Sequence, residues 1–294
     1  ALIGAGHTVA AVFAQPDKPV GRKQILTPPP VKVCAQMHGI PVFQPRTLRD
    51  GEAENIIRNI APDVIAVVAY GKILPTEILT LPRYGCVNGH ASLLPKYRGA
   101  APIQWCIVNG EKETGVTAMQ MDEGMDTGDI LETAVTEIGA EETAGELFER
   151  LSVIGAKLLA KTIADLENGS ITPIKQDESK ATSAPIIKKE MAKISFCDMT
   201  AEEVHNAVRG FYPWPVAFFI SGGKRIKIIK SRVVNMHGTA GAVLKSDSEL
   251  IVACKKEAVA LETIQPEGSK PMSAKQYLCG RPIALGAEIE DENG

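Results

Sequence analysis

The sequence has 294 residues, of which 45% are hydrophobic and 23% are charged, so it is long enough for one large domain or two ordinary ones. Its longest apolar runs are too short to cross a bilayer and no charged-then-apolar leader opens it, which argues against a membrane protein and predicts a cytoplasmic location. The six cysteines are scattered, with no CxxC pair and no histidine at ligand spacing, so we expect neither a disulfide framework nor a metal site.

The net charge is only −3, but it is unevenly distributed along the chain. Residues 188–285 contain 15 Lys and Arg against 9 Asp and Glu. A basic half of this kind favours a polyanionic partner.

The first half alternates short β-branched runs with helical patterns. We predict strands at residues 7–15, 40–45, 63–71, 85–91, 114–122 and 128–137. We predict helices at residues 31–39, 51–61, 74–81, 99–110 and 143–169. The strand at 63–71 is apolar, as in strands that are buried on both faces of a parallel sheet. This alternation predicts an α/β fold with a doubly wound, mostly parallel sheet, whose ligands bind beyond the carboxyl ends of the strands.

The pattern changes after residue 169. Residues 170–189 are polar and aperiodic, which predicts a linker between a catalytic domain at 1–169 and a second domain at 190–294. A helix at 199–211 is followed by short alternating strands with turn signals, at residues 216–221, 224–234, 239–246, 249–255 and 258–266. These strands predict a small, OB-like β-barrel.

The chain opens with "ALIGAGHTV", which has the pattern of the last turns of a helix. A parallel sheet of this type normally begins with a strand before that helix, so we expect the first strand to be missing. Its loss would expose a sheet edge and apolar core.

Polar side chains end two of the predicted strands. Asn88 and His90 lie two residues apart on a strand, so they point to the same side. Asp122, Asp126 and Asp129 follow another strand in a Gly-rich loop, from which one carboxylate can meet the imidazole. Such a set suits acyl transfer to an amine, without a nucleophile elbow. A structural histidine beside a solvated Asp-rich turn fits the same pattern.

The run "NGHASLLPKYRGAAPIQ", followed by "DEGMDTGDIL", resembles the folate-dependent formyltransferase family, whose members transfer a formyl group from 10-formyltetrahydrofolate to an amine. The resemblance implies that Asn88, His90 and Asp126 are the catalytic residues, with Asp122 and Asp129 shaping the loop. It also implies a stretch that contacts folate, made of Ser92, Leu93, Leu94 and Pro95. The co-substrate implied is 10-formyltetrahydrofolate, with no metal.

Three further stretches resemble the members that act on methionine carried by initiator tRNA: "QPDKPVGRK", "VRGFYPWP" and "QPEGSKPMSAKQYLCGRPI". The resemblance implies initiator tRNA as the partner of a monomeric enzyme. It also places Arg22 and Lys23 in a loop beside the acceptor end of the tRNA.

The stretch "KRIKIIKSR" supports a nucleic-acid partner on physical grounds. Its basic residues, which include Lys224, Arg225, Lys227 and Lys230, can contact phosphates and give salt-sensitive affinity. A charged, solvated edge strand has the same composition.

Two alternatives remain open from the sequence: a formyltransferase that acts on an amino sugar nucleotide, and a non-catalytic protein that binds tRNA or folate. The chain also departs from its relatives at two positions. Gly89 replaces a branched apolar residue between the two polar side chains, and Ser183 stands where many relatives have Tyr.

Overall fold

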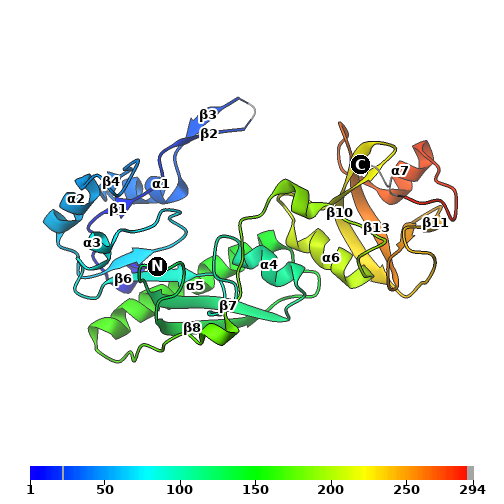
Figure 1. The fold of residues 1–294 in the computed structure, drawn as a ribbon. Helices are drawn as coiled ribbons and strands as arrows, with labels where there is room; N and C mark the ends of the chain where they lie inside the picture. Colours follow the sequence, from blue (N-terminus) through cyan, green and yellow to red (C-terminus); the bar gives the residue numbers. More distant parts are fainter. Residues whose placement is uncertain (22, 290–294) are drawn as a thin grey trace. The chain divides into compact units, whose positions relative to one another are not determined.

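The computed structural model describes residues 1–21 and 23–289, which divide into two compact units (Figure 1). The first unit comprises Ala1–Arg98, Gly115–Val135 and Leu151–Ser183. The second comprises Gly99–Thr114, Thr136–Arg150 and the chain from Ala184 onward. The domain boundaries that we place at residues 169 and 189 stay a prediction. Within the described ranges, no helix is long and apolar enough to cross a membrane.

The first unit begins with short elements: a 3-10 helix η1 (Ile3–Ala5), β1 (Val12–Phe13), β2 (Lys18–Val20), β3 (Ile25–Thr27), α1 (Pro30–Met37) and β4 (Val42–Phe43). β1 and β4 pair in parallel, as expected of strands joined through a helix. Gly39 has a φ of +66° just beyond α1, the left-handed conformation that commonly ends a helix. β2 and β3 form an antiparallel hairpin that stands clear of β1 and α1 (Figure 1).

The chain continues through α2 (Glu52–Ile60), β5 (Ile65–Val67), α3 (Thr76–Leu79), β6 (Cys86–His90), α4 (Pro102–Val108), β7 (Glu113–Gln120), β8 (Ile130–Glu137) and α5 (Ala144–Glu167). Strands β5 to β8 form one sheet in that order. β5 runs parallel to β6, whereas β7 runs antiparallel to β6. The predicted α/β fold is therefore confirmed, with a mixed sheet.

The prediction that the strand at 63–71 is buried on both faces is wrong. The residues of β5 are only half-buried, and Val68 just beyond them is 63% exposed. The reason is position, because β5 is an edge strand that pairs with β6 alone in the part of the chain that the structure describes.

A compact apolar cluster supports β6 from one side. Ala53 and Ile57 lie one turn apart on α2, so both side chains reach the cluster. Ile78 of α3 and Cys86 of β6 are fully buried in it. Burial raises the pKa of the Cys86 thiol to about 12, so this cysteine is a packing residue and not a nucleophile at neutral pH.

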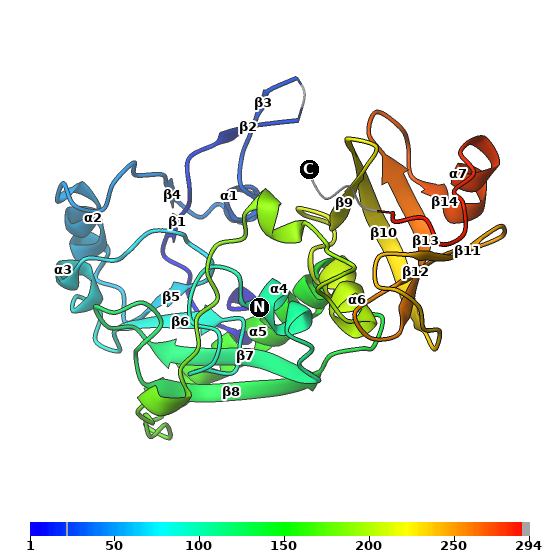
Figure 2. The ribbon, with the colours of Figure 1, turned by 45° about the vertical axis from the view of Figure 1, so that its right-hand side comes forward.

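The second unit contains η3 (Lys189–Ala192), α6 (Ala201–Gly210), β9 (Phe218–Ser221), β10 (Lys224–Val234), β11 (Val243–Ser246), β12 (Leu250–Ala253), β13 (Ala258–Pro266), β14 (Met272–Ser273) and α7 (Ala274–Gly280). Its strands form a curled antiparallel sheet in the order β11-β12-β13-β10-β9, with β14 against β13 (Figure 2). This half-barrel is consistent with the predicted OB-like fold.

Local sequence signals explain the elements of this unit. Thr200 and Glu203 form a capping box at the start of α6, with each side chain bonded to the other residue's backbone N–H. On β10 the side chains alternate, so that Ile226 and Ile228 are buried while Arg225 is exposed. The isoleucines join an apolar core that lies between α6 and the sheet.

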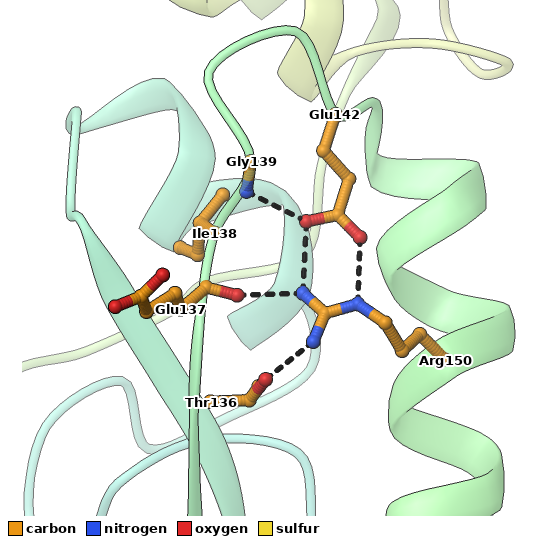
Figure 3. A pocket seen from close by; sticks show the side chains of 6 residues that line it. All are labelled: Thr136, Glu137, Ile138, Gly139, Glu142 and Arg150. Atoms are coloured by element: carbon orange, nitrogen blue, oxygen red, sulfur yellow. Dashed lines mark hydrogen bonds and ion pairs between the residues drawn. The ribbon is translucent and has the colours of Figure 1, made fainter.

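Arg150 holds the turn between β8 and α5 (Figure 3). Its guanidinium donates to both carboxylate oxygens of Glu142, at 2.8 and 2.9 Å, and also to Thr136 and to the carbonyl of Glu137. The Gly139 N–H donates to the same carboxylate at 3.0 Å. Burial acts to raise the pKa of Glu142, but the bonds from Arg150 and Gly139 outweigh it and leave the pKa below its ordinary value.

The lowered pKa of Glu142 predicts a pH-dependent contribution to stability. A carboxylate with a depressed pKa stabilises the fold above its unfolded-state pKa of about 4.3, and this contribution is lost as the pH falls through the folded-state value. We expect Glu142→Gln to lower the unfolding free energy by about 1–3 kcal/mol at pH 7. The difference from wild type should shrink at about pH 3.5.

Denaturant titration at both pH values measures this difference. Glu137→Gln is the matched control, because its side chain has no hydrogen-bond or ion-pair partner in the described chain (Figure 3). We expect the control to change stability by less than about 0.5 kcal/mol at either pH. A Glu142→Gln effect that stays constant between the two pH values would contradict the assignment.

Candidate active site

β6 carries the two polar residues that the sequence singled out. Asn88 pairs with Val67 of β5 on one side and with Met119 of β7 on the other, so the strand is fixed from both edges. The Asn88 side chain is half-buried and has no hydrogen-bond partner among the described residues. Its amide is therefore available to a ligand. His90, at the end of the strand, is only 6% exposed.

The two ring nitrogens of His90 face different partners. Nε2 lies 2.9 Å from the carbonyl oxygen of Tyr97, and because a carbonyl only accepts, Nε2 must carry the proton. Nδ1 lies 3.6 Å from Oδ2 of Asp126. This distance is long for a hydrogen bond, but it places the carboxylate directly beside the ring. The structure thus brings together the histidine and the aspartate named from the sequence.

The loop between β7 and β8 determines where Asp126 points. Asp126 itself has a φ of +56°, a left-handed conformation that is uncommon for residues other than glycine. Asp122 shapes the loop, since its Oδ1 accepts from the Gly124 N–H at 3.0 Å and from the Thr127 hydroxyl at 2.7 Å. Asp129 instead lies 3.3 Å from Lys175 at the surface.

Two glycines allow this loop to fold tightly. A Cβ on Gly128 would lie 1.7 Å from the carbonyl oxygen of Gln120, and a Cβ on Gly124 would lie 1.9 Å from the hydroxyl of Thr127. Gly89 differs, since a Cβ there would meet only Val68, at 3.7 Å, which is ordinary van der Waals contact. The glycine between the two polar residues of β6 therefore leaves open space instead of making a close backbone approach.

The "SLLP" stretch forms the turn that follows His90. Ser92 is fully buried, and its hydroxyl donates to the Lys96 carbonyl at 2.7 Å. Leu94 is also buried, and its N–H donates to the Thr117 hydroxyl at 3.2 Å. Leu93 and Pro95 are half-buried. The contact of this stretch with folate stays a prediction.

The basic residues predicted to bind tRNA lie apart from this site along the chain. Arg22 falls outside the described residues, and Lys23 is exposed in the loop of the β2–β3 hairpin. On β10, Lys230 pairs with Glu262 at 3.2 Å and Arg225 lies over the ring of Phe218 at 4.1 Å.

Two basic side chains of β10 remain unengaged. The ammonium groups of Lys224 and Lys227 have no hydrogen-bond or ion-pair partner in the described parts of the chain. They are the members of this set most readily available to a phosphate.

Sequence reasoning missed several residues that support the histidine. Tyr97 contributes only a backbone carbonyl, which no side-chain pattern can signal. Gln176 donates to two carbonyls of the Asp126 loop from a segment without periodicity, and Thr182 binds the backbone around Tyr97 from the same segment.

Two other features of the molecule do not form candidate sites. The open pocket lined by residues 136–150 contains none of the candidate residues, and its charged groups bond to one another (Figure 3). Among the residues that the structure describes, no group of three His, Cys, Asp or Glu side chains is gathered as a metal site requires.

Comparison with known protein families gives two matches. Residues 3–163 match the family described as Formyl transferase, and residues 186–282 match the family described as Formyl transferase, C-terminal domain.

Curated relatives cover nearly the whole chain. The methionyl-tRNA formyltransferase of Alkaliphilus oremlandii is 49% identical over 288 residues, which are 97% of this chain and 93% of the relative. The methionyl-tRNA formyltransferase of Geotalea uraniireducens is 47% identical over 287 residues, which are 97% of this chain and 91% of the relative.

Solved structures share the fold at lower identity. An N-formyltransferase from Helicobacter canadensis, in complex with folinic acid and dTDP-3-aminofucose, has a TM-score of 0.64 at 20% identity, covering 88% of this chain and 100% of that one. HypX from Aquifex aeolicus, in complex with tetrahydrofolic acid, has a TM-score of 0.62 at 16% identity, covering 91% of this chain and 46% of that one.

The contrast between Gly128 and Gly89 predicts opposite effects of the same substitution. Gly128→Ala should lower the unfolding free energy by about 1–3 kcal/mol, because its Cβ would overlap the Gln120 carbonyl and force the loop to shift. Gly89→Ala should be neutral or stabilise by up to about 1 kcal/mol, because it adds an ordinary contact and restricts the unfolded chain.

Thermal and denaturant unfolding of the two variants tests this contrast. Each glycine is the control for the other, since both variants add a single methyl group in the first unit. Equal destabilisation of the two variants would show that the strand at Gly89 is as tightly constrained as the loop.

Proposed function

Because the chain belongs to the formyl transferase family, and within it to the methionyl-tRNA formyltransferases, we propose that it transfers the formyl group of 10-formyltetrahydrofolate to the amino group of methionyl initiator tRNA. The observation that carries the proposal is the pairing of His90 with Asp126 at the end of the strand that also presents Asn88. The same three side chains are the ones that the family resemblance implies.

Each side chain has a role in direct transfer. The neutral methionyl amine attacks the formyl carbon, which forms a C–N bond and a tetrahedral oxyanion. The unengaged amide of Asn88 donates to this oxyanion, and the imidazolium of His90 stabilises its charge. The carboxylate of Asp126 lies 3.6 Å from Nδ1 and orients the imidazole ring toward the reacting groups.

The reaction ends when the bond between the formyl carbon and N10 of the folate breaks. The attacking amine loses a proton to Asp126 or to water, and the departing N10 gains one, so charge and protons balance. No covalent intermediate on the protein is needed, which agrees with the buried, high-pKa thiol of Cys86 on the same strand.

The tRNA contacts are proposed for the basic residues of β10 and for the β2–β3 hairpin. Lys224 and Lys227 support this role because their ammonium groups have no hydrogen-bond or ion-pair partner among the described residues. Lys230 and Arg225 contribute less, because an acidic side chain and a ring already engage them.

An amino sugar nucleotide is not favoured as the acceptor. The solved N-formyltransferase of Helicobacter canadensis, in complex with dTDP-3-aminofucose, is 20% identical to this chain, whereas the two methionyl-tRNA formyltransferases compared above are 49% and 47% identical along nearly all of it. Assaying both acceptors with the same preparation separates the two functions.

Truncation of the proposed catalytic side chains should reduce turnover strongly. We expect Asn88→Ala, His90→Ala and Asp126→Ala each to lower kcat by about a hundredfold or more, because each removes a group that stabilises charge in the transition state. Formylation of charged initiator tRNA in single-turnover mode measures the effect.

Asp129→Asn is the matched control for the aspartate. It lies in the same loop, but its carboxylate makes only a surface ion pair with Lys175, so we expect a change of less than about threefold. If the three alanine variants keep near-normal rates, the catalytic assignment is wrong.

The basic residues of β10 predict that kcat/KM for tRNA depends on the salt concentration. The logarithm of kcat/KM should fall linearly with the logarithm of the salt concentration, because each phosphate contact releases counterions. The double variant Lys224→Gln, Lys227→Gln should reduce the slope by roughly one to two.

The double variant Lys255→Gln, Lys256→Gln is the charge-matched control, since both lysines are exposed in the turn between β12 and β13. It should leave the slope within about 0.3 of wild type. Equal effects of the two double variants would indicate general electrostatic attraction and would contradict a specific role of β10.

A further inference from the structure

The segment from Ile174 to Ser183, the last part of the first unit, forms a strap that is hydrogen-bonded to the rest of that unit, although its sequence has the pattern of a linker. Ile174 exchanges two backbone hydrogen bonds of 2.8 Å with Ile130 at the start of β8. Ser183 forms an isolated parallel bridge with Arg98. The strap therefore bonds both to the strand that follows the Asp126 loop and to the turn that follows β6.

Gln176 in this strap bonds to the loop that carries Asp126. Its Nε2 donates to the carbonyl of Asp126 at 2.9 Å and to the carbonyl of Gly128 at 2.7 Å. Its Oε1 accepts from Nε and Nη2 of Arg98, at 3.0 and 2.7 Å. Two donors face one end of the amide and two acceptors face the other, so only this orientation of the amide satisfies all four contacts.

Arg98 holds the oxygen end of the Gln176 amide, and we call this set of hydrogen bonds between Arg98, Gln176 and the Asp126 loop the clamp. Besides Gln176, its guanidinium bonds to both carboxylate oxygens of Glu178, at 2.8 and 2.9 Å. The hydrogen bonds to Glu178 are the largest cause that raises the pKa of Arg98, and the charges of Asp122 and Asp126 raise it further. The guanidinium thus lies within electrostatic reach of the catalytic loop.

The same strap also supports the second partner of the histidine. The Thr182 hydroxyl accepts from the Tyr97 N–H at 2.8 Å, and the Thr182 carbonyl accepts from the Arg98 N–H at 2.8 Å. The Tyr97 carbonyl in turn accepts from His90. The two groups that face the ring nitrogens of His90 are the Tyr97 carbonyl and the Asp126 carboxylate. The backbone of each of these two residues is therefore hydrogen-bonded to the strap at 174–183.

We propose that Gln176 is a positioning residue for formyl transfer: its amide, held by Arg98, fixes the Asp126 loop so that the carboxylate faces Nδ1 of His90. The left-handed backbone of Asp126 requires such support, because this conformation costs energy for a residue with a side chain. The inference rests on the proposed function for its kinetic consequence, but the fixing of the loop is measurable without activity.

Two substitutions remove the clamp in different ways. Gln176→Glu keeps the acceptor for Arg98 but loses the two donated bonds and sets a carboxylate oxygen against two carbonyls. Gln176→Met removes all four bonds without adding charge. Both should lower kcat by about ten- to a hundredfold, since misplacing a catalytic group by about 1 Å has costs of that order. KM for each substrate should stay within about threefold of wild type, because the lost alignment acts on the transition state.

A double-mutant cycle separates positioning of Asp126 from a general structural role. In an Asp126→Asn background, where the carboxylate is absent, Gln176→Glu should lower kcat by no more than about threefold further. Asp177→Asn, which alters the neighbouring residue but keeps the acceptor for Ser179, should leave kcat within about twofold of wild type. Additive losses in the cycle, or a loss confined to KM, would overturn the proposal.

Hydrogen exchange tests the loop itself. The backbone amides of residues 122–129 should exchange at least about tenfold faster in Gln176→Met than in wild type, while those of β6 stay unchanged. Unchanged exchange in the loop would overturn the proposal even if kcat falls. If the wild-type protein transfers no formyl group to methionyl-tRNA, the proposed function fails, and the exchange result still decides whether Gln176 holds the loop.

Discussion

The buried imidazole at the end of β6 is the constraint on which the site depends. His90 has one ring nitrogen bonded to a backbone carbonyl and the other directed at a carboxylate, so the orientation of its ring is determined from both sides. Neither partner lies on β6. The chemistry of the strand therefore depends on the accuracy with which two separate loops are held against it.

Guanidinium groups hold the loops in each unit, and the reason is the number of donors that arginine presents. A tight loop leaves several carbonyls and carboxylates without partners, and one planar group can satisfy many of them at once. Arg98 does so through Gln176 and Glu178 in the first unit. In the second, Arg150 bonds to the β8–α5 turn, and buried Arg209 donates to two carbonyls of that turn.

The sequence predicted most elements because their signals are local. Strand alternation, helical periodicity and turn signals depend on neighbouring residues, and the helix at 143–169 and the strand at 224–234 lie where the sequence predicts them. The predicted burial of β5 on both faces is wrong because burial depends on which strands lie beside it. The sequence does not predict the strap at 174–183, because its hydrogen bonds run to residues that are distant in sequence. A polar, aperiodic segment has the same sequence pattern whether it is solvated or bonded to the rest of the fold.

The difference between local and long-range signals also explains why the sequence motif points to the proposed chemistry but not to the residues that orient the site. Asn88, His90 and Asp126 are recognisable because the proposed reaction uses their functional groups directly, so the side chains themselves carry the signal. Tyr97 acts through a carbonyl and Gln176 through an amide that only needs to reach two other carbonyls. Residues that orient a catalytic group are chosen by geometry, which sequence encodes only through the whole fold. The sequence therefore reveals the reactive side chains of such a site, whereas the structure reveals the hydrogen bonds that orient them.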